Sequence, residues 1–135
     1  MEKEPVPFTY SEITRNVRVS VRPQYLDDHS DPDRGVFVFA YSVTVENFGL
    51  ETVQLLRRHW VVNSGGGLYT EVKGDGVVGE QPVLACGDSF TYTSTSMIKD
   101  PVGSMYGTYM FQSEDGQDFE VTIPEFDLVF PGSIH

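Results

Sequence analysis

The chain has 135 residues, is 39% hydrophobic and 13% aromatic, and carries a formal net charge of −11. This size and apolar share predict one domain over residues 1–135, with an ordered core of about 10–130. The acidic balance argues against nucleic-acid binding, which needs clustered lysines and arginines. No apolar run approaches the roughly 20 residues that membrane insertion requires.

In chain order, alternation and β-branched runs predict strands throughout the sequence. Residues 17–22 alternate valines with polar residues, and Pro23 marks an edge or an end of that strand. Further strands are predicted at 36–45, 52–62, 67–73, 89–95, 106–112 and 119–123. Residues 114–117 close a hairpin, Pro124 limits the last strand, and 126–130 continue along an edge.

These strands, with no convincing amphipathic helix of about ten residues or more, predict an all-β fold. The expected architecture is an immunoglobulin/fibronectin type III-like antiparallel β-sandwich of about seven to eight strands, with a small β-barrel as the alternative. Residues 1–7 and 131–135 are expected to fray. The single cysteine, Cys86, and a charged rather than leader-like N-terminus predict a cytoplasmic protein.

Gly74, Gly76 and Gly79 form a GxGxxG spacing, which in dinucleotide-binding proteins follows a strand and opens a helix. A strand before these glycines is plausible. A helix after them is not, because the β-branched valines, Gly79 and Pro82 all oppose it. We therefore expect a glycine-rich β-connection, with an anion-binding backbone nest as the alternative.

The run Arg57-Arg58-His59-Trp60 lies inside a predicted strand, so alternate residues face opposite sides. Trp60 is expected in the core, which places Arg58 either near a strand end or rotated out by a bulge. Arg57 is then free to face an anion or a partner carboxylate. The alternative is that these arginines stack on aromatic rings or pair with the surplus acids.

Neither a metal site nor a catalytic site is predicted. The acidic run 27–33 lacks the ligand pattern of a calcium loop and is expected to be a solvated turn, with a weak divalent-cation site as the alternative. His29, His59 and His135 are scattered, and Cys86 with Gly87 and Asp88 is typical of a turn rather than of an activated nucleophile. No cofactor is expected.

Several segments, taken together, resemble the ApaG family in order and spacing. They are VQLLRRHW at 53–60, VKGDGVVGEQPVL at 72–84, FTYTS at 90–94, MYGTYM at 105–110 and FEVTIPEF at 119–126. The likeness covers about residues 14–131, and Cys86 departs from it because the family commonly places proline there. The resemblance implies a sandwich fold and gives no established catalytic residues to transfer. It also implies a genetic link to a diadenosine tetraphosphatase, a label of association with cobalt and magnesium efflux, and occurrence as an interaction domain in F-box proteins.

The leading functional prediction is therefore a non-enzymatic binding module with a protein partner. One alternative is phosphate or dinucleoside-polyphosphate binding, with a pyrophosphate-containing small molecule held by Gly74, Gly76, Gly79 and Arg57. The other is a soluble accessory factor linked to cobalt and magnesium efflux.

Overall fold

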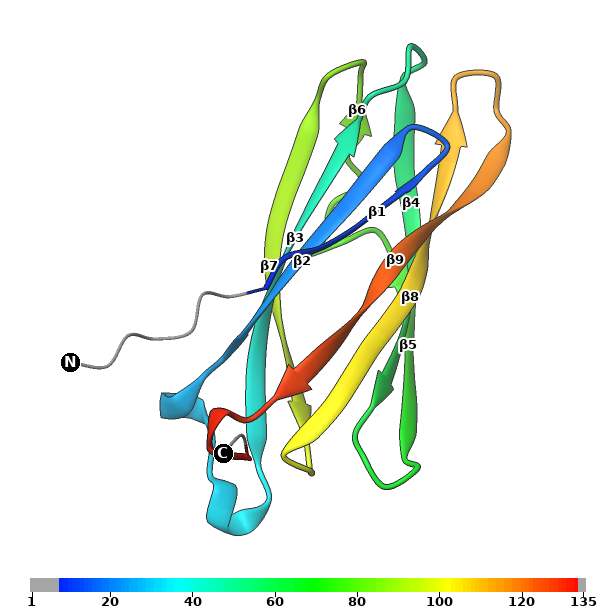
Figure 1. The fold of residues 1–135 in the computed structure, drawn as a ribbon. Coiled ribbons are helices and arrows are strands. Elements are labelled where there is room, and N and C mark those ends of the chain that lie inside the picture. Colours follow the sequence, from blue (N-terminus) through cyan, green and yellow to red (C-terminus); the bar gives the residue numbers. More distant parts are fainter. Residues whose placement is uncertain (1–7, 134–135) are drawn as a thin grey trace, which may run out of the picture.

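The computed structural model describes residues 8–133, which form two antiparallel sheets packed face to face (Figure 1). This confirms the predicted antiparallel β-sandwich, with nine strands instead of seven or eight. The strands are β1 (Tyr10–Thr14), β2 (Val17–Tyr25), β3 (Phe37–Asn47), β4 (Val53–Asn63), β5 (Tyr69–Asp75), β6 (Val83–Leu84), β7 (Ser89–Ile98), β8 (Val102–Ser113) and β9 (Asp118–Val129). Three short 3-10 helices accompany them: η1 (Asp27–His29), η2 (Pro32–Arg34) and η3 (Pro131–Ser133).

One sheet has the order β1-β2-β3-β7, and the other has the order β5-β4-β8-β9 with β6 also paired to β4. The core lies between them because each strand alternates: every second residue of β3, from Phe37 to Asn47, is buried. The aromatic side chains of Trp60, Tyr109 and Phe126 meet at the centre, edge to face in two of their contacts.

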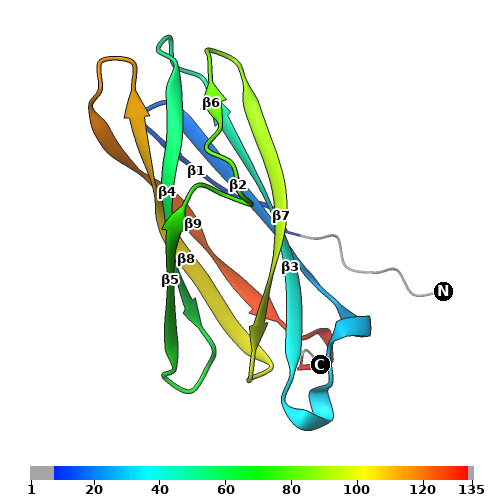
Figure 2. The ribbon, with the colours of Figure 1, turned by 180° about the vertical axis from the view of Figure 1, so that it is seen from behind.

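The two lateral margins of the sandwich differ. At one margin β9 packs against β1 and β2, where the Thr122 amide donates to Thr14 Oγ1 and the Asp127 amide to the Tyr10 hydroxyl. At the other margin, β5 and β7 end their sheets (Figure 2). The loop between β5 and β6 crosses this open side, and its Val77 is fully buried there.

Both prolines predicted to stop strands lie inside them. Pro23 lies within β2 and pairs with Tyr41 of β3. Strand β1 pairs with β2 only as far as Val21, so within residues 8–133 the side of Pro23 that faces away from β3 is a free edge. The predicted edge position is confirmed, and the alternative that the strand ends at Pro23 is wrong. Pro124 lies within β9 where the β8–β9 register shifts, so it does not limit that strand, and the predicted continuation along an edge is confirmed as far as Val129. Proline is tolerated at such bulged and edge positions because no ladder hydrogen bond is lost.

The turn predicted at residues 114–117 is present in the structure. The predicted hairpin follows β8, and the Ser113 hydroxyl and the Gln117 amide both donate to the Asp115 carboxylate, which lowers its pKa. Residues 131–133 form η3 rather than a frayed end, whereas residues 1–7 and 134–135 lie outside the described part. Within residues 8–133, no helix is long and apolar enough to cross a bilayer.

Candidate functional site

Strand β4 changes phase at Leu56. The β4–β8 register shifts between Leu55 and Arg57, which marks a β-bulge. Leu55 is buried before the bulge and Trp60 after it, so Arg58 shares the inner face with Trp60 while Arg57 points outward. The core position of Trp60 is confirmed. The prediction that Arg58 lies near a strand end or is rotated outward is wrong, because the bulge precedes it and keeps it in phase with Trp60.

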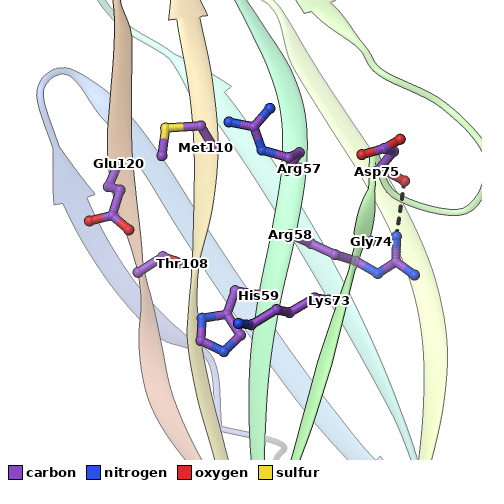
Figure 3. Close-up of a pocket in the computed structure, with 9 residues that line it drawn as sticks. All are labelled: Arg57, Arg58, His59, Lys73, Gly74, Asp75, Thr108, Met110 and Glu120. Carbon is purple, nitrogen blue, oxygen red and sulfur yellow. Dashed lines mark hydrogen bonds between the residues drawn. The ribbon is translucent and has the colours of Figure 1, made fainter.

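Arg58 runs from mid-strand to the open margin and holds the loop that follows β5. Its Nη1 donates to the carbonyl oxygens of Asp75, at 3.0 Å, and Gly76, at 2.9 Å. Figure 3 shows the guanidinium lying against Gly74, on the opposite side of β4 from Arg57. A Cβ at Gly74 would sit 2.8 Å from both terminal nitrogens of Arg58. A side chain at this position would therefore have to displace the guanidinium of Arg58, which is the end of a flexible side chain.

The other two glycines belong to a tight hairpin turn. Val77 and Glu80 exchange backbone hydrogen bonds of 2.8 and 2.9 Å, and the two residues between them, Val78 and Gly79, have φ values of 43° and 82°. Positive φ at both central positions is typical of a type I′ turn. A Cβ at Gly76 would collide with the backbone carbonyl oxygen of Glu80, and its φ is 62°, so this position needs glycine.

The bulge of β4 anchors this loop. The Leu56 carbonyl oxygen accepts from the Gly76 amide at 2.7 Å and from Gln81 Nε2 at 2.9 Å, and the Leu55 amide donates to the Pro82 carbonyl oxygen at 3.0 Å. The segment from 72 to 84 and the segment from 53 to 60 are thus parts of one structural unit.

Most backbone amides of the predicted anion-binding loop are already hydrogen-bonded within the protein. A strand does precede the glycines, and β6 rather than a helix follows them, as expected for a β-connection. The amides of Gly76, Val77 and Glu80 are engaged within the protein, and the Asp75 and Gly76 carbonyls face Arg58. In the described residues, the amides at the turn tip, Val78 and Gly79, make no such bond. Anion binding at this loop stays a prediction.

Arg57 opens into a hollow of about 370 Å³ on the outer face of the five-stranded sheet. The hollow is lined by Arg57, Arg58, His59, Lys73, Gly74, Asp75, Thr108, Met110 and Glu120. The structure therefore brings Arg57 and Gly74 together, whereas Gly76 and Gly79 lie beyond its wall. The strand register explains why most of the other lining residues are neighbours. Arg57 pairs with Asp75 and with Met110, and His59 pairs with Lys73 and with Thr108.

The basic side chains of this hollow make few close ion pairs, although the carboxylates of Asp75 and Glu120 also line it. The shortest ion pair of Arg57 joins its Nη2 to Asp118 Oδ2 at 3.9 Å, and His59 Nε2 lies 3.2 Å from Glu71 Oε1. Lys73 makes no ion pair with any residue that the structure describes. Its side chain extends across β4 toward the His59 ring (Figure 3). Three outward-facing nitrogen-bearing side chains thus gather on one surface of an acidic protein.

An aromatic surface continues the hollow along the sheet. Tyr69 on β5 and Tyr106 on β8 lie on the same outer face as His59, by alternation, and their side chains are 61% and 39% exposed. The sequence interpretation named Arg57 and missed Lys73, Tyr69 and Tyr106. Period-two alternation could have placed each of them on one face of its own strand, but only the register shows that the three strands share that face.

Tyr41, Tyr92 and Tyr109 are buried inside the sandwich. The hydroxyls of Tyr92 and Tyr109 are hydrogen-bonded to each other, and Tyr41 lies opposite Ser94 in the β3–β7 ladder. Burial raises the pKa of Tyr41, Tyr92 and Tyr109, while the charge of Arg58 opposes the shift. These groups stay protonated near neutral pH and act as fixed hydrogen-bonding partners.

The remaining sequence candidates occupy turns. Residues 27–33 cover η1 and the start of η2 with no buried residue, and Arg34 lies 3.5 Å from Asp31. Cys86 is exposed between β6 and β7, in the turn where the Asp88 amide donates to the Ala85 carbonyl oxygen. Within residues 8–133, no three His, Cys, Asp or Glu side chains gather as a metal site. His135 lies outside that part.

Comparison with known proteins gives one consistent family. The family model described as ApaG domain matches residues 27–113. "Protein ApaG" of Paramagnetospirillum magneticum and that of Rhodospirillum centenum are each 52% identical over 122 residues, which is 90% of this chain and 94% of each relative. A crystal structure of a putative ApaA protein from Bordetella pertussis is 42% identical and superposes with a TM-score of 0.83, covering 94% of this chain and 98% of that one.

Proposed function

The chain belongs to the ApaG domain family, and from that premise we propose that it is a non-enzymatic binding module for a protein partner. The recognition surface is the hollow around Arg57 together with the adjoining tyrosines, Tyr69 and Tyr106. The partner presents a carboxylate-bearing segment to this surface. The names of the relatives carry no catalytic activity, and the fold alone does not define a function.

The observation that supports this proposal is the incomplete neutralisation of the cations. The chain has 20 acidic residues against nine lysines and arginines, yet Lys73 has no carboxylate partner in the described residues and Arg57 has a distant one. An acidic group of a partner can approach both side chains at once. Charge-assisted hydrogen bonds of this kind are stronger than neutral ones, and arginine can engage a carboxylate with two parallel bonds.

The surface around these cations also has the composition of a protein interface. Arginine and tyrosine are enriched among the residues that contribute most to binding. Tyrosine buries a large area with only two side-chain torsions, and the planar guanidinium of arginine can bind a carboxylate with two hydrogen bonds. Here Met110 lines the charged hollow, and Tyr69 and Tyr106 lie on the same outer face beyond one end of it. Strands β4, β5 and β8 fix the backbone positions of these residues relative to one another, so no backbone ordering is needed on binding.

A charge-reversal experiment tests the surface. The double variant Arg57→Glu/Lys73→Glu is used as bait in native lysate beside the wild-type chain, with quantitative mass spectrometry of the captured proteins. The matched control is Arg22→Glu, because Arg22 is an exposed arginine on the outer face of the other sheet. We expect at least one protein to be captured reproducibly by wild type and by Arg22→Glu, and to be lost from the double variant.

Two results would count against the proposal. One is the absence of any reproducible partner of the wild-type chain. The other is equal capture by the wild-type protein and the double variant, which would place recognition on another surface. Circular dichroism confirms that each bait is folded before its capture is compared.

Phosphate or dinucleoside-polyphosphate binding is the second candidate. It is favoured by Arg57 and Gly74 lining the same hollow and by the two unbonded amides at the turn tip, Val78 and Gly79. Titration of the ¹⁵N-labelled chain with pyrophosphate and with diadenosine tetraphosphate would then shift the amide resonances of Gly74, Gly76 and Gly79 saturably. No shift at millimolar ligand would remove this candidate while leaving the protein-binding proposal intact.

A link to cobalt and magnesium efflux would act through a partner in this scheme. The described residues offer no cluster of metal-ligating side chains, and 27–33 is a solvated turn. Calorimetry with cobalt and with magnesium distinguishes an indirect role through a partner from direct binding of the cation. Binding of cobalt or magnesium to the isolated chain would point to a direct role instead.

A further inference from the structure

The four edges of the two sheets are protected to different degrees. The edges of β1 and β9 lie against each other, and two backbone amides of β9 donate to side-chain oxygens of β1. Strand β5 is short and carries Glu71, Lys73 and Asp75, and charged side chains discourage a second strand from pairing. Strand β7 has none of these protections.

Strand β7 (Ser89–Ile98) is long, uncharged and free of proline, and it consists largely of threonine, serine and aromatic residues. One side pairs with β3 along the full length of the strand. In the part of the chain that the structure describes, no backbone hydrogen bond joins β7 to any segment other than β3. Its other side therefore presents unpaired amides and carbonyls to solvent, which is a template for an added strand.

The charge of the chain is distributed so that a second copy can approach this edge. The strands of the four-stranded sheet contain Glu12 and Glu46 against Arg18 and Arg22, so their charges cancel. The strands of the other sheet contain six acidic residues and three lysines or arginines. The uncharged edge therefore belongs to the sheet whose strands carry no net charge, so these strands add no net repulsion between two copies.

We propose that β7 pairs antiparallel with β7 of a second copy of this chain, forming a two-fold symmetric dimer with one continuous eight-stranded sheet. In such a pair, residues on the same face oppose each other, so the register centres on one residue. Centring on Ser94 would set Asp88 against Asp100. Centring on Thr93 avoids this, keeps 89–97 paired, and sets Thr91 against Thr95 and Thr93 against its own copy.

The expected association is weak. Pairing of one strand edge buries less area than a standard stable interface, so we expect a dissociation constant on the order of micromolar to millimolar. The dimer extends the four-stranded sheet sideways and leaves the outer face of the five-stranded sheet uncovered. It is independent of the proposed recognition by the hollow, and would supply two such hollows in one particle.

Sedimentation equilibrium from about 10 μM to about 1 mM at physiological salt tests the dimer. The wild-type chain should shift from monomer to dimer across this range. Thr93→Lys and Thr93→Glu each place like charges opposite each other at the centre and should raise the dissociation constant at least about tenfold. An equimolar mixture of the two variants should restore dimerisation, because opposite charges then meet.

The matched control is Gln24→Lys, which adds an exposed lysine to the outer face of the same sheet on β2 and should dimerise like wild type. A wild-type chain that stays monomeric to about 1 mM would overturn the proposal and leave the edge to a strand of another protein. Dimers that persist in both Thr93 variants, or that the mixture fails to restore, would overturn it as well.

Discussion

Arg57 and Arg58 are neighbours in sequence, yet they belong to regions with opposite roles. Arg58 runs along the inner face to the margin of the sandwich, where it bonds two carbonyl oxygens and lies against Gly74. Arg57 points outward into an open hollow, and its shortest ion pair measures 3.9 Å. The inner arginine is engaged by hydrogen bonds within the protein, whereas the outer one has only a long ion pair among the described residues.

Within one segment, some residues have a structural role and Arg57 belongs to the proposed recognition surface. Arg58, Gly74, Gly76 and Gln81 hold the β5–β6 loop against the bulge of β4, which explains why these residues occur together. Arg57 has no part in that unit. A glycine motif that in other folds cradles phosphate here accommodates an arginine and a turn.

The largest expected difference lies between the two arginines themselves. Arg58→Ala removes two hydrogen bonds of a charged donor and leaves two carbonyls without it, so it should lower the free energy of unfolding by about 2 kcal/mol. Arg57→Ala should change it by less than about 0.5 kcal/mol, because that side chain is half exposed. Urea denaturation of both variants measures this. Equal losses of unfolding free energy in the two variants would contradict the distinction between the two arginines.

Gly74→Ala tests whether Gly74 is needed only for the approach of Arg58. The new Cβ displaces the guanidinium, and the free energy of unfolding should fall by about 1.5 kcal/mol in the wild-type background. In the Arg58→Ala background the same change should cost about zero, since the colliding side chain is gone. A double-mutant cycle in urea gives the coupling. Additive losses would mean that Gly74 is required for another reason.

Alkaline pH should lower the stability of the protein through the buried tyrosines of the inner region. Folding raises the pKa of Tyr41, Tyr92 and Tyr109, so above about pH 10 the unfolded chain ionises while the folded chain stays protonated, and stability falls as pH rises. Tyr92→Phe should lessen the loss between about pH 9 and pH 11 by about 1 kcal/mol. Thermal melts at each pH measure it. Arg57→Ala should leave the profile unchanged, and an altered profile would link the two regions.

The smallest expected effect is a gain at the turn tip. Val78 is β-branched at a φ of 43°, a conformation that asparagine tolerates better and that type I′ turns favour for it. Val78→Asn should therefore raise the free energy of unfolding by about 0.5 kcal/mol. Ligand or partner binding at the hollow should not change. A loss of stability would mean that the exposed valine contributes packing that outweighs its strain.

Much of the fold could be predicted because long runs of alternation identify strands directly. The strands missed were β1 and β6. Strand β1 has three exposed residues in a row, so it shows no alternation. The turn from β1 to β2 is formed by Arg15 and Asn16, both at positive φ, and contains no glycine that would mark it in the sequence. Strand β6 has two residues, too few for any period to show. The strand ends predicted at Pro23 and Pro124 are wrong, because a strand tolerates proline at a free edge or at a bulge. Both are properties of the assembled sheet.

By itself the sequence determined the family, the all-β class and the core position of Trp60, since local patterns of alternation and motif order carry that information. Only the tertiary structure decided the roles of the two arginines and the glycines. The phase of β4 depends on the bulge at Leu56, which is set by pairing with β8. The hollow around Arg57 and the free edge of β7 depend on which strands become neighbours, and contacts between distant segments decide that.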